Sequence, residues 1–221
     1  SFKGQLDGSF FLPYTSRMID ASVAYSNLPE TGFHVYTTAD GTIDIPASEM
    51  VHGNEEHIRV NPKLRMDRGK DGKKHPSRYF IAMYHFHNLI FPPSPRDIGS
   101  IMRRQDDPYN ESTVFVTRGK QPGRLDIIFR TPETQDFTSD QERNAWIEQW
   151  NSISTQRIAD RLMREAIARR NSHLPIMTAS ESVQIQADEH YEIVKEMCRE
   201  RHLRWFRGVD EQSPILSEVV L

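Results

Sequence analysis

The sequence predicts an α/β (α+β) fold, a mixed sheet flanked by helices, over residues 1–131, followed by a C-terminal helical extension of two long helices over residues 132–221. Two observations predict it. In the first part, short stretches rich in β-branched and aromatic residues alternate with helical patterns. In the second part, apolar residues recur at the spacing of amphipathic helices. A chain of 221 residues is long enough for one domain with an extension.

The composition and charge of the chain argue against several classes of protein. The 28 Lys and Arg residues against 31 Asp and Glu residues leave a net charge of -3, so no overall field attracts nucleic acid or a membrane surface. No apolar run approaches the length of about 18 residues that a membrane span needs. The single cysteine, Cys198, excludes an internal disulfide framework and fits a reducing compartment. We therefore expect a cytoplasmic protein with no membrane partner, and we favour a protein partner over nucleic acid. A secreted effector is the alternative.

The first part contains strands and helices in a definite order. Apolar spacing over residues 15–27 indicates an amphipathic helix, which Pro29 ends. The turn Ala39-Asp40-Gly41 predicts a hairpin between two strands. The predicted strands are residues 9–12, 30–38, 42–45, 79–84, 113–117 and 124–130, with a second helix over residues 95–104.

Residues 46–78 form a basic loop insertion within this part. The segment lacks a regular pattern up to residue 77, and its half from Arg59 to Arg78 is strongly basic and contains glycines. Such a loop would face an acidic protein or nucleic acid, or it would be a solvated loop, which charge runs without interleaved aromatic residues commonly are.

The second part begins with a helix-start signal. Ser139 and Glu142 have the spacing of a capping box, and a helical pattern runs from there to about Asn171. A second helix is expected from about Ser180 to Arg207. These helices would pack on the core as a layer, or form a dimer or partner interface, where Trp and Arg are enriched.

A candidate metal site lies at the end of the strand 79–84. His85 and His87 are two residues apart, so in a strand their side chains share a face. Asp97 falls in the first turn of the next helix. Two imidazoles and a carboxylate make a three-ligand zinc site with a fourth position open. The alternative is purely structural: Ser94, Pro95 and Asp97 also have the pattern of a helix N-terminus.

Glu30 opens the strand that follows the first helix, where it would serve as a general base or be an exposed acid. Together, Glu30, His85-x-His87 and Ser94-x-x-Asp97 resemble the JAMM motif of the MPN/JAB-like zinc metalloprotease family, over about residues 9–131. The loop from His87 to Ser94 is one residue shorter than is usual in that family, and bacterial JAB-like members also vary in this loop. The extension after Thr131 has no counterpart in the resemblance.

The resemblance implies an MPN-like fold and a zinc-dependent isopeptidase or peptidase acting on ubiquitin or ubiquitin-like conjugates. By it, His85, His87 and Asp97 would bind Zn²⁺. Glu30 would take a proton from the water that zinc activates and pass it to the leaving amine, and Ser94 would help hold the oxyanion. The alternatives are a non-catalytic MPN-type scaffold, or a toxin-like effector hydrolase acting on another amide or on nucleic acid.

Overall fold

The computed structural model describes residues 5–7, 31–38, 40, 42–44, 51–52, 66–86, 91–102, 114–119, 124–209 and 215–221. Within these ranges it contains three helices and eleven strands. The helices are α2 Pro95–Ser100, α3 Asp140–Asn171 and α4 Ala179–Arg201. The strands are β1 Gln5–Asp7, β2 Thr31–Thr38, β3 Ile43–Asp44, β4 Val51–His52, β5 Met66–Arg68, β6 Lys74–Pro76, β7 Arg78–Phe86, β8 Val114–Gly119, β9 Arg124–Phe129, β10 Arg204–Val209 and β11 Ile215–Glu218.

Nine of the described strands form one mixed sheet in the order β1-β11-β10-β9-β8-β7-β2-β3, with β4 also paired to β2. Every neighbouring pair is antiparallel except β7 and β8, which are parallel. Because parallel neighbours need a crossover, the segment between them carries α2. The fold is therefore α+β, as the sequence predicts at the level of fold class.

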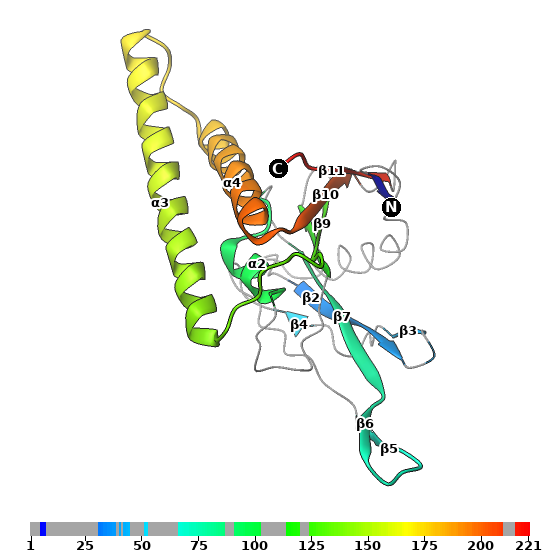
Figure 1. Ribbon diagram of the computed structural model, residues 1–221. Coiled ribbons are helices and arrows are strands. Elements are labelled where there is room, and N and C mark those ends of the chain that lie inside the picture. The colour runs from blue at the N-terminus through cyan, green and yellow to red at the C-terminus, as the bar shows by residue number, and fades with distance from the viewer. Residues whose placement is uncertain are drawn as a thin grey trace.

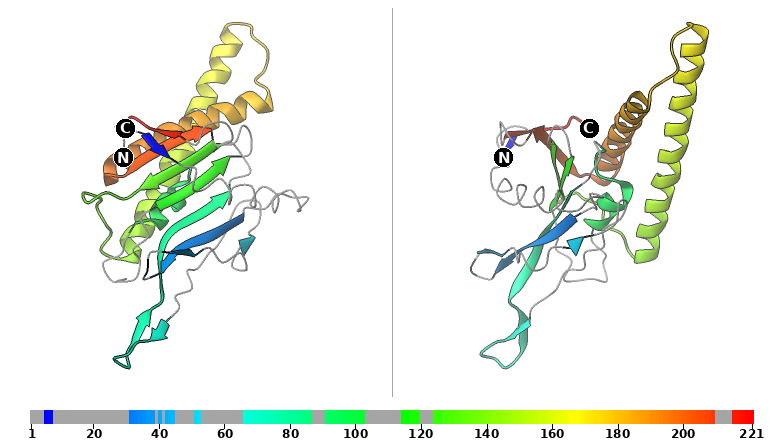
Figure 2. Two further views of the ribbon diagram at one scale, coloured as in Figure 1. Left: turned by 90° about the vertical axis from the view of Figure 1, so that its right-hand side faces the viewer. Right: turned by 180° about the vertical axis from the view of Figure 1, so that it is seen from behind.

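The three described helices lie on the same side of the sheet, and α3 projects well past its edge (Figures 1 and 2). The apolar core lies between these helices and β9 and β10. Its buried members are Ile98, Ile101, Met102, Ile128, Phe137, Trp146, Ile147, Trp150, Ile193, Val194, Met197, Cys198, Leu203, Trp205 and Val219. One core therefore joins α2, which precedes residue 131, to α3 and α4, which follow it.

The short helix α2 packs tightly on α3. An added Cβ on Gly99 would lie 2.6 Å from Ile147 Cδ1 and 2.7 Å from Ile147 Cγ1. Glycine at this position lets the backbone of α2 approach the first turns of α3, because a side chain would overlap the isoleucine. This close approach holds α2 against α3 near the carboxyl end of α2.

The expected end of the second long helix is wrong. The helix stops at Arg201, His202 adopts the left-handed conformation with φ 56°, and β10 begins at Arg204. β10 pairs with β9, and β11 follows it in the sheet. The segment after residue 131 is thus two helices plus two strands, because Trp205 on β10, fully buried, fills the core from the sheet.

The basic insertion is not wholly irregular. Residues 66–76 form the antiparallel hairpin β5–β6, which projects from the start of β7 (Figure 1). Its cations Arg68, Lys70, Lys73 and Lys74 are exposed, as are Asp67 and Asp71. The β2–β3 hairpin and strands β7, β8 and β9 confirm the predicted strands there within a few residues. The predicted strand at 9–12 and helix at 15–27 lie outside the described residues.

No helix among the described residues is both long and apolar enough to cross a membrane.

Candidate active site

The strands that carry the candidate residues are direct neighbours in the sheet. β2 and β7 pair antiparallel, with Gly32 opposite His85 and Thr31 opposite Phe86. In the chain, Glu30 precedes Thr31 and His87 follows Phe86. The β2–β7 pairing therefore places the start of β2, which follows Glu30 in the chain, beside the end of β7, which precedes His87.

The carboxyl end of β7 lies beside that of its parallel neighbour β8, with His85 opposite Thr117. In sheets with parallel strands, ligands bind most often at the carboxyl ends of the strands. The chain then enters α2 after a short connection. Strand end and helix start are thus close in sequence on the same crossover, which is where the sequence predicts the site.

The start of α2 is a capping box, as the helix-start interpretation predicts. Ser94 is the N-cap, Pro95 lies in the first turn and Asp97 is at N3. Asp97 Oδ2 accepts hydrogen bonds from Ser94 N and from Ser94 Oγ, both at 2.7 Å. In return Asp97 N donates to Ser94 Oγ at 3.3 Å. Both side chains are half-buried.

This arrangement bears on the predicted roles of both residues. Metal-binding carboxylates are commonly oriented by a hydrogen bond from a second group, and Ser94 orients Asp97 in this way. The donor set of two imidazoles and one such carboxylate fits zinc. The Ser94 hydroxyl proton is directed at Asp97, so donation to an oxyanion requires the hydroxyl to turn from that bond.

The other candidates lie partly or wholly outside the described structure. Glu30 and His87 are outside the described residues, and for His85 the description covers the backbone and not the side chain. Among the described side chains, no three His, Cys, Asp or Glu residues are grouped as metal ligands would be. The zinc triad and the general base therefore stay predictions.

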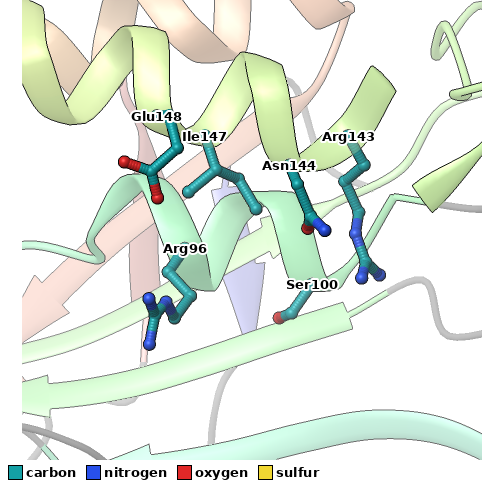
Figure 3. A pocket seen from close by; sticks show the side chains of 6 residues that line it. All are labelled: Arg96, Ser100, Arg143, Asn144, Ile147 and Glu148. Carbon is teal, nitrogen blue, oxygen red and sulfur yellow. The ribbon is translucent and has the colours of Figure 1, made fainter. Parts of the chain in front are cut away.

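A pocket that the sequence does not reveal lies between α2 and the first turns of α3 (Figure 3). Its volume is about 420 Å³. The residues lining this α2–α3 pocket are Arg96, Ser100, Arg143, Asn144, Ile147 and Glu148. The only signal in the sequence is that Arg96 and Ser100 share a face of a helix, which is too common to indicate a site.

A second hollow of about 530 Å³ lies at the base of the β5–β6 hairpin, between it and the β2–β3 turn. Asp40, on its rim, accepts hydrogen bonds from the Thr38 hydroxyl and from Thr42 N. These bonds lower the pKa of the Asp40 carboxyl. On the hairpin, the hydrogen bond from His75 likewise lowers the pKa of Asp71. Both carboxylates stabilise local turns by these hydrogen bonds.

Models of known protein families, curated proteins and solved structures yield no match to this chain.

Proposed function

We propose that the chain is a zinc-dependent isopeptidase or peptidase of the JAMM type, which cleaves ubiquitin or ubiquitin-like conjugates. The observation that carries the proposal is the pairing of β2 with β7, which sets Gly32 opposite His85. It supports the proposal because the motif needs the strand of the glutamate beside the strand of the histidines. An MPN-like arrangement of the sheet is part of this proposal.

The capping box at α2 supports the role of Asp97. Its carboxylate is held by two hydrogen bonds from Ser94, so it loses little freedom on becoming a ligand beside His85 and His87. Zinc bound by these three residues supplies a Lewis acid that polarises the substrate carbonyl and lowers the pKa of water.

The remaining steps belong to side chains of this chain. Glu30 accepts a proton from the attacking water as the tetrahedral centre forms, and gives it to the amine nitrogen as the carbon–nitrogen bond breaks. Ser94 donates a hydrogen bond from its hydroxyl to the developing oxyanion, after turning from Asp97. The exposed cations of the β5–β6 hairpin offer a surface for an acidic part of the substrate protein.

Metal content tests the site directly. Purified protein reconstituted with zinc should hold about one zinc per chain. The His85→Ala/His87→Ala variant should hold none, while His75→Ala, which changes an exposed hairpin histidine, should hold as much as wild type. Elemental analysis distinguishes these results, and equal zinc in all three proteins would exclude the site.

Activity is the second readout. Wild type should cleave linked ubiquitin chains, and a chelator should stop it. Glu30→Gln should keep its zinc and lose cleavage, because the base is removed and the ligands are retained. Zinc binding without cleavage of any ubiquitin-like conjugate would keep the metal site and reject the substrate.

A second candidate function is docking, by self-association of the C-terminal helices, and one observation favours it. Met163 and Ile167, one turn apart on the projecting part of α3, are 62% and 52% exposed, and Leu174 and Ile176 in the following connection are 58% and 93% exposed. Such apolar exposure is typical of an interface. Analytical ultracentrifugation should show a dimer of the wild-type protein, and the Met163→Ser/Ile167→Ser variant should be a monomer. A monomeric wild type would exclude self-association through these helices.

A further inference from the structure

We propose that the α2–α3 pocket binds a carboxylate of a polypeptide, carried by an acidic side chain or by a chain terminus. Its volume of about 420 Å³ lies in the range of small-ligand sites and accommodates an acidic residue with its flanking backbone. The inference that the pocket binds a carboxylate rests on the pocket itself. The inference that this carboxylate belongs to the substrate rests on the proposed peptidase function.

Two helices line the pocket in opposite directions. Arg96 and Ser100 lie one turn apart on α2, and Asn144 and Glu148 lie one turn apart on α3. Figure 3 shows Arg96 and Glu148 at one end of the pocket and Arg143 at the other, with Ser100 and Asn144 between them. The contact of Gly99 with Ile147 holds the helices at this separation, so the pocket is preformed.

Arg96 is the principal cation available to a ligand. Its side chain is exposed, and within the described structure it has neither a hydrogen bond nor an ion pair. Arg143 already forms an ion pair with Asp140, with 2.7 Å between Nη2 and Oδ1, and its side chain is 24% exposed. A guanidinium presents its N–H donors as a planar fork that matches the two oxygens of a carboxylate.

The polar groups in the middle of the pocket suit a peptide. The Ser100 hydroxyl donates to Asp97 O at 2.6 Å, so towards a ligand it acts as an acceptor. The Asn144 carboxamide is both donor and acceptor, as the backbone of a peptide requires. Ile147, 8% exposed, provides an apolar wall for the methylene groups of a Glu side chain.

Glu148 limits the charge of the ligand. It lies at the same end as Arg96, is exposed and has no ion pair within the described structure. The pocket therefore carries two guanidinium groups and one carboxylate, and Arg143 is partly neutralised by Asp140. A carboxylate with one negative charge suits this balance better than a phosphate group with two, which Glu148 repels more strongly.

The location links the pocket to the proposed catalytic centre. Arg96 directly precedes Asp97, and Ser100 bonds to the backbone of Asp97. A substrate with an acidic residue seated in the pocket would thus be anchored on the helix that carries the third proposed zinc ligand. An acidic residue close to the cleaved bond is the specificity that follows from this placement.

Binding of short peptides in the presence of a chelator tests the inference without turnover. The first probe is Gly-Gly-Glu-Gly-Gly with acetylated and amidated ends, compared with the same peptide carrying Gln. The second is acetylated Gly-Gly-Gly with a free carboxyl end, compared with its amide. Titrations followed by chemical shifts give each Kd. The Glu peptide or the free-carboxyl peptide should bind, its neutral counterpart should bind at least tenfold more weakly, and the responsive pair identifies the source of the carboxylate.

Variants that remove a positive or a negative charge should change the affinity in opposite directions, which makes the test specific to charge. Arg96→Gln should weaken binding by about tenfold, and Arg96→Lys by less, because lysine keeps the charge and loses the fork. Glu148→Gln should tighten binding about threefold, because a like charge is removed. Arg170→Gln, an exposed arginine outside the pocket, is the matched control and should leave Kd unchanged. Thermal melts check that each variant is folded.

Equal binding of charged and neutral peptides, no binding of either, or unchanged Kd in Arg96→Gln would overturn the inference. None of these results depends on zinc or on cleavage. If the pocket binds a carboxylate and the protein holds no zinc, the proposed function alone fails. If zinc-dependent cleavage occurs without peptide binding, the pocket proposal alone fails.

Discussion

Arg207 on β10 lies directly opposite Asp126 on β9 and donates from Nε and Nη2 to the two carboxylate oxygens, at 2.6 Å and 3.2 Å. Trp205, two residues earlier on the same face, donates from Nε1 to Asp126 Oδ1 at 2.8 Å. The Asp126 side chain is only 3% exposed. This buried pair joins the strand before residue 131 to a strand that follows both long helices.

Removing Arg207 should be strongly destabilising. Arg207→Met leaves the buried Asp126 carboxylate with Trp205 as its remaining side-chain donor in this network, and breaking a buried pair in this way costs about 3–5 kcal/mol. Urea unfolding measures the free energy. Arg204→Met is the matched control on the same strand: Arg204 and Glu218 are 39% and 31% exposed, so its loss should be about 0–1 kcal/mol. Equal losses in the two variants would contradict the buried-pair argument.

The contact between Gly99 and Ile147 should reverse the usual effect of alanine in a helix. Gly99→Ala would gain up to about 1 kcal/mol of helix propensity in the absence of neighbours. Here the new Cβ overlaps the buried Ile147 side chain, and overpacking costs about 1–3 kcal/mol, so we expect net destabilisation. In the Ile147→Ala background, which removes both overlapping atoms, Gly99→Ala should stabilise. A double-mutant cycle by denaturant unfolding checks this; additive effects would mean that the helices move apart freely.

Two substitutions at the start of α2 separate helix capping from metal binding. Ser94→Ala removes the N-cap and should lower the free energy of unfolding by about 1 kcal/mol, whichever role Asp97 has. Asp97→Asn keeps an oxygen at N3 that accepts the capping hydrogen bond, but replaces the anionic ligand. We expect zinc affinity to fall at least tenfold with little change in the stability of the apo-protein. Unchanged zinc affinity would show that Asp97 is a cap and not a ligand.

The link between α3 and α4 should depend on pH through Glu181. Glu181 accepts hydrogen bonds from Arg169 Nη2 at 2.7 Å and from Thr178 N at 2.7 Å. These bonds lower the pKa of Glu181 from 4.5 to about 2. Since the folded-state pKa is depressed, the carboxylate stabilises the fold above the unfolded-state pKa, and this contribution is lost as the pH falls from 4.5 towards 2.

Comparing the free energies of unfolding of wild type and Glu181→Gln across this pH range tests the assignment. Their difference should be constant above pH 5.5 or so and should shrink below it. In the Arg169→Gln background the pH dependence should be smaller, because the largest cause of the pKa shift is removed. A difference that does not change with pH would contradict the role of Arg169.

The starts of the helices are predictable from sequence. Ser94 with Asp97 and Ser139 with Glu142 are pairs three residues apart, and the hydroxyl of each N-cap accepts the N3 backbone N–H as predicted. One detail differs: the Glu142 carboxylate accepts from Thr138 N and Oγ, both at 2.6 Å, and not from the backbone of Ser139. A local hydrogen bond needs only near neighbours, so a short pattern specifies it.

The end of α4 and the placement of the last strands are not predictable in this way. The apolar spacing that marks α4 continues past Arg201, and the sequence up to Arg207 therefore resembles more helix. The structure ends the helix at Arg201 and places Trp205 opposite Ile128 on β9. Trp205 is fully buried there, and its indole N–H bonds to Asp126.

By itself, the sequence determined the α+β class, the starts of the described helices and the strands β2, β3, β7, β8 and β9, because periodicity and capping depend on residues within a turn or a strand. Only the tertiary structure decided that β10 and β11 complete the sheet, and that Arg96 and Glu148 face one pocket. The reason is physical: strand pairing and pockets between helices depend on residues that are distant in the chain. A local sequence pattern does not specify which distant segment will bury the apolar surface of a strand or pair with a buried charge.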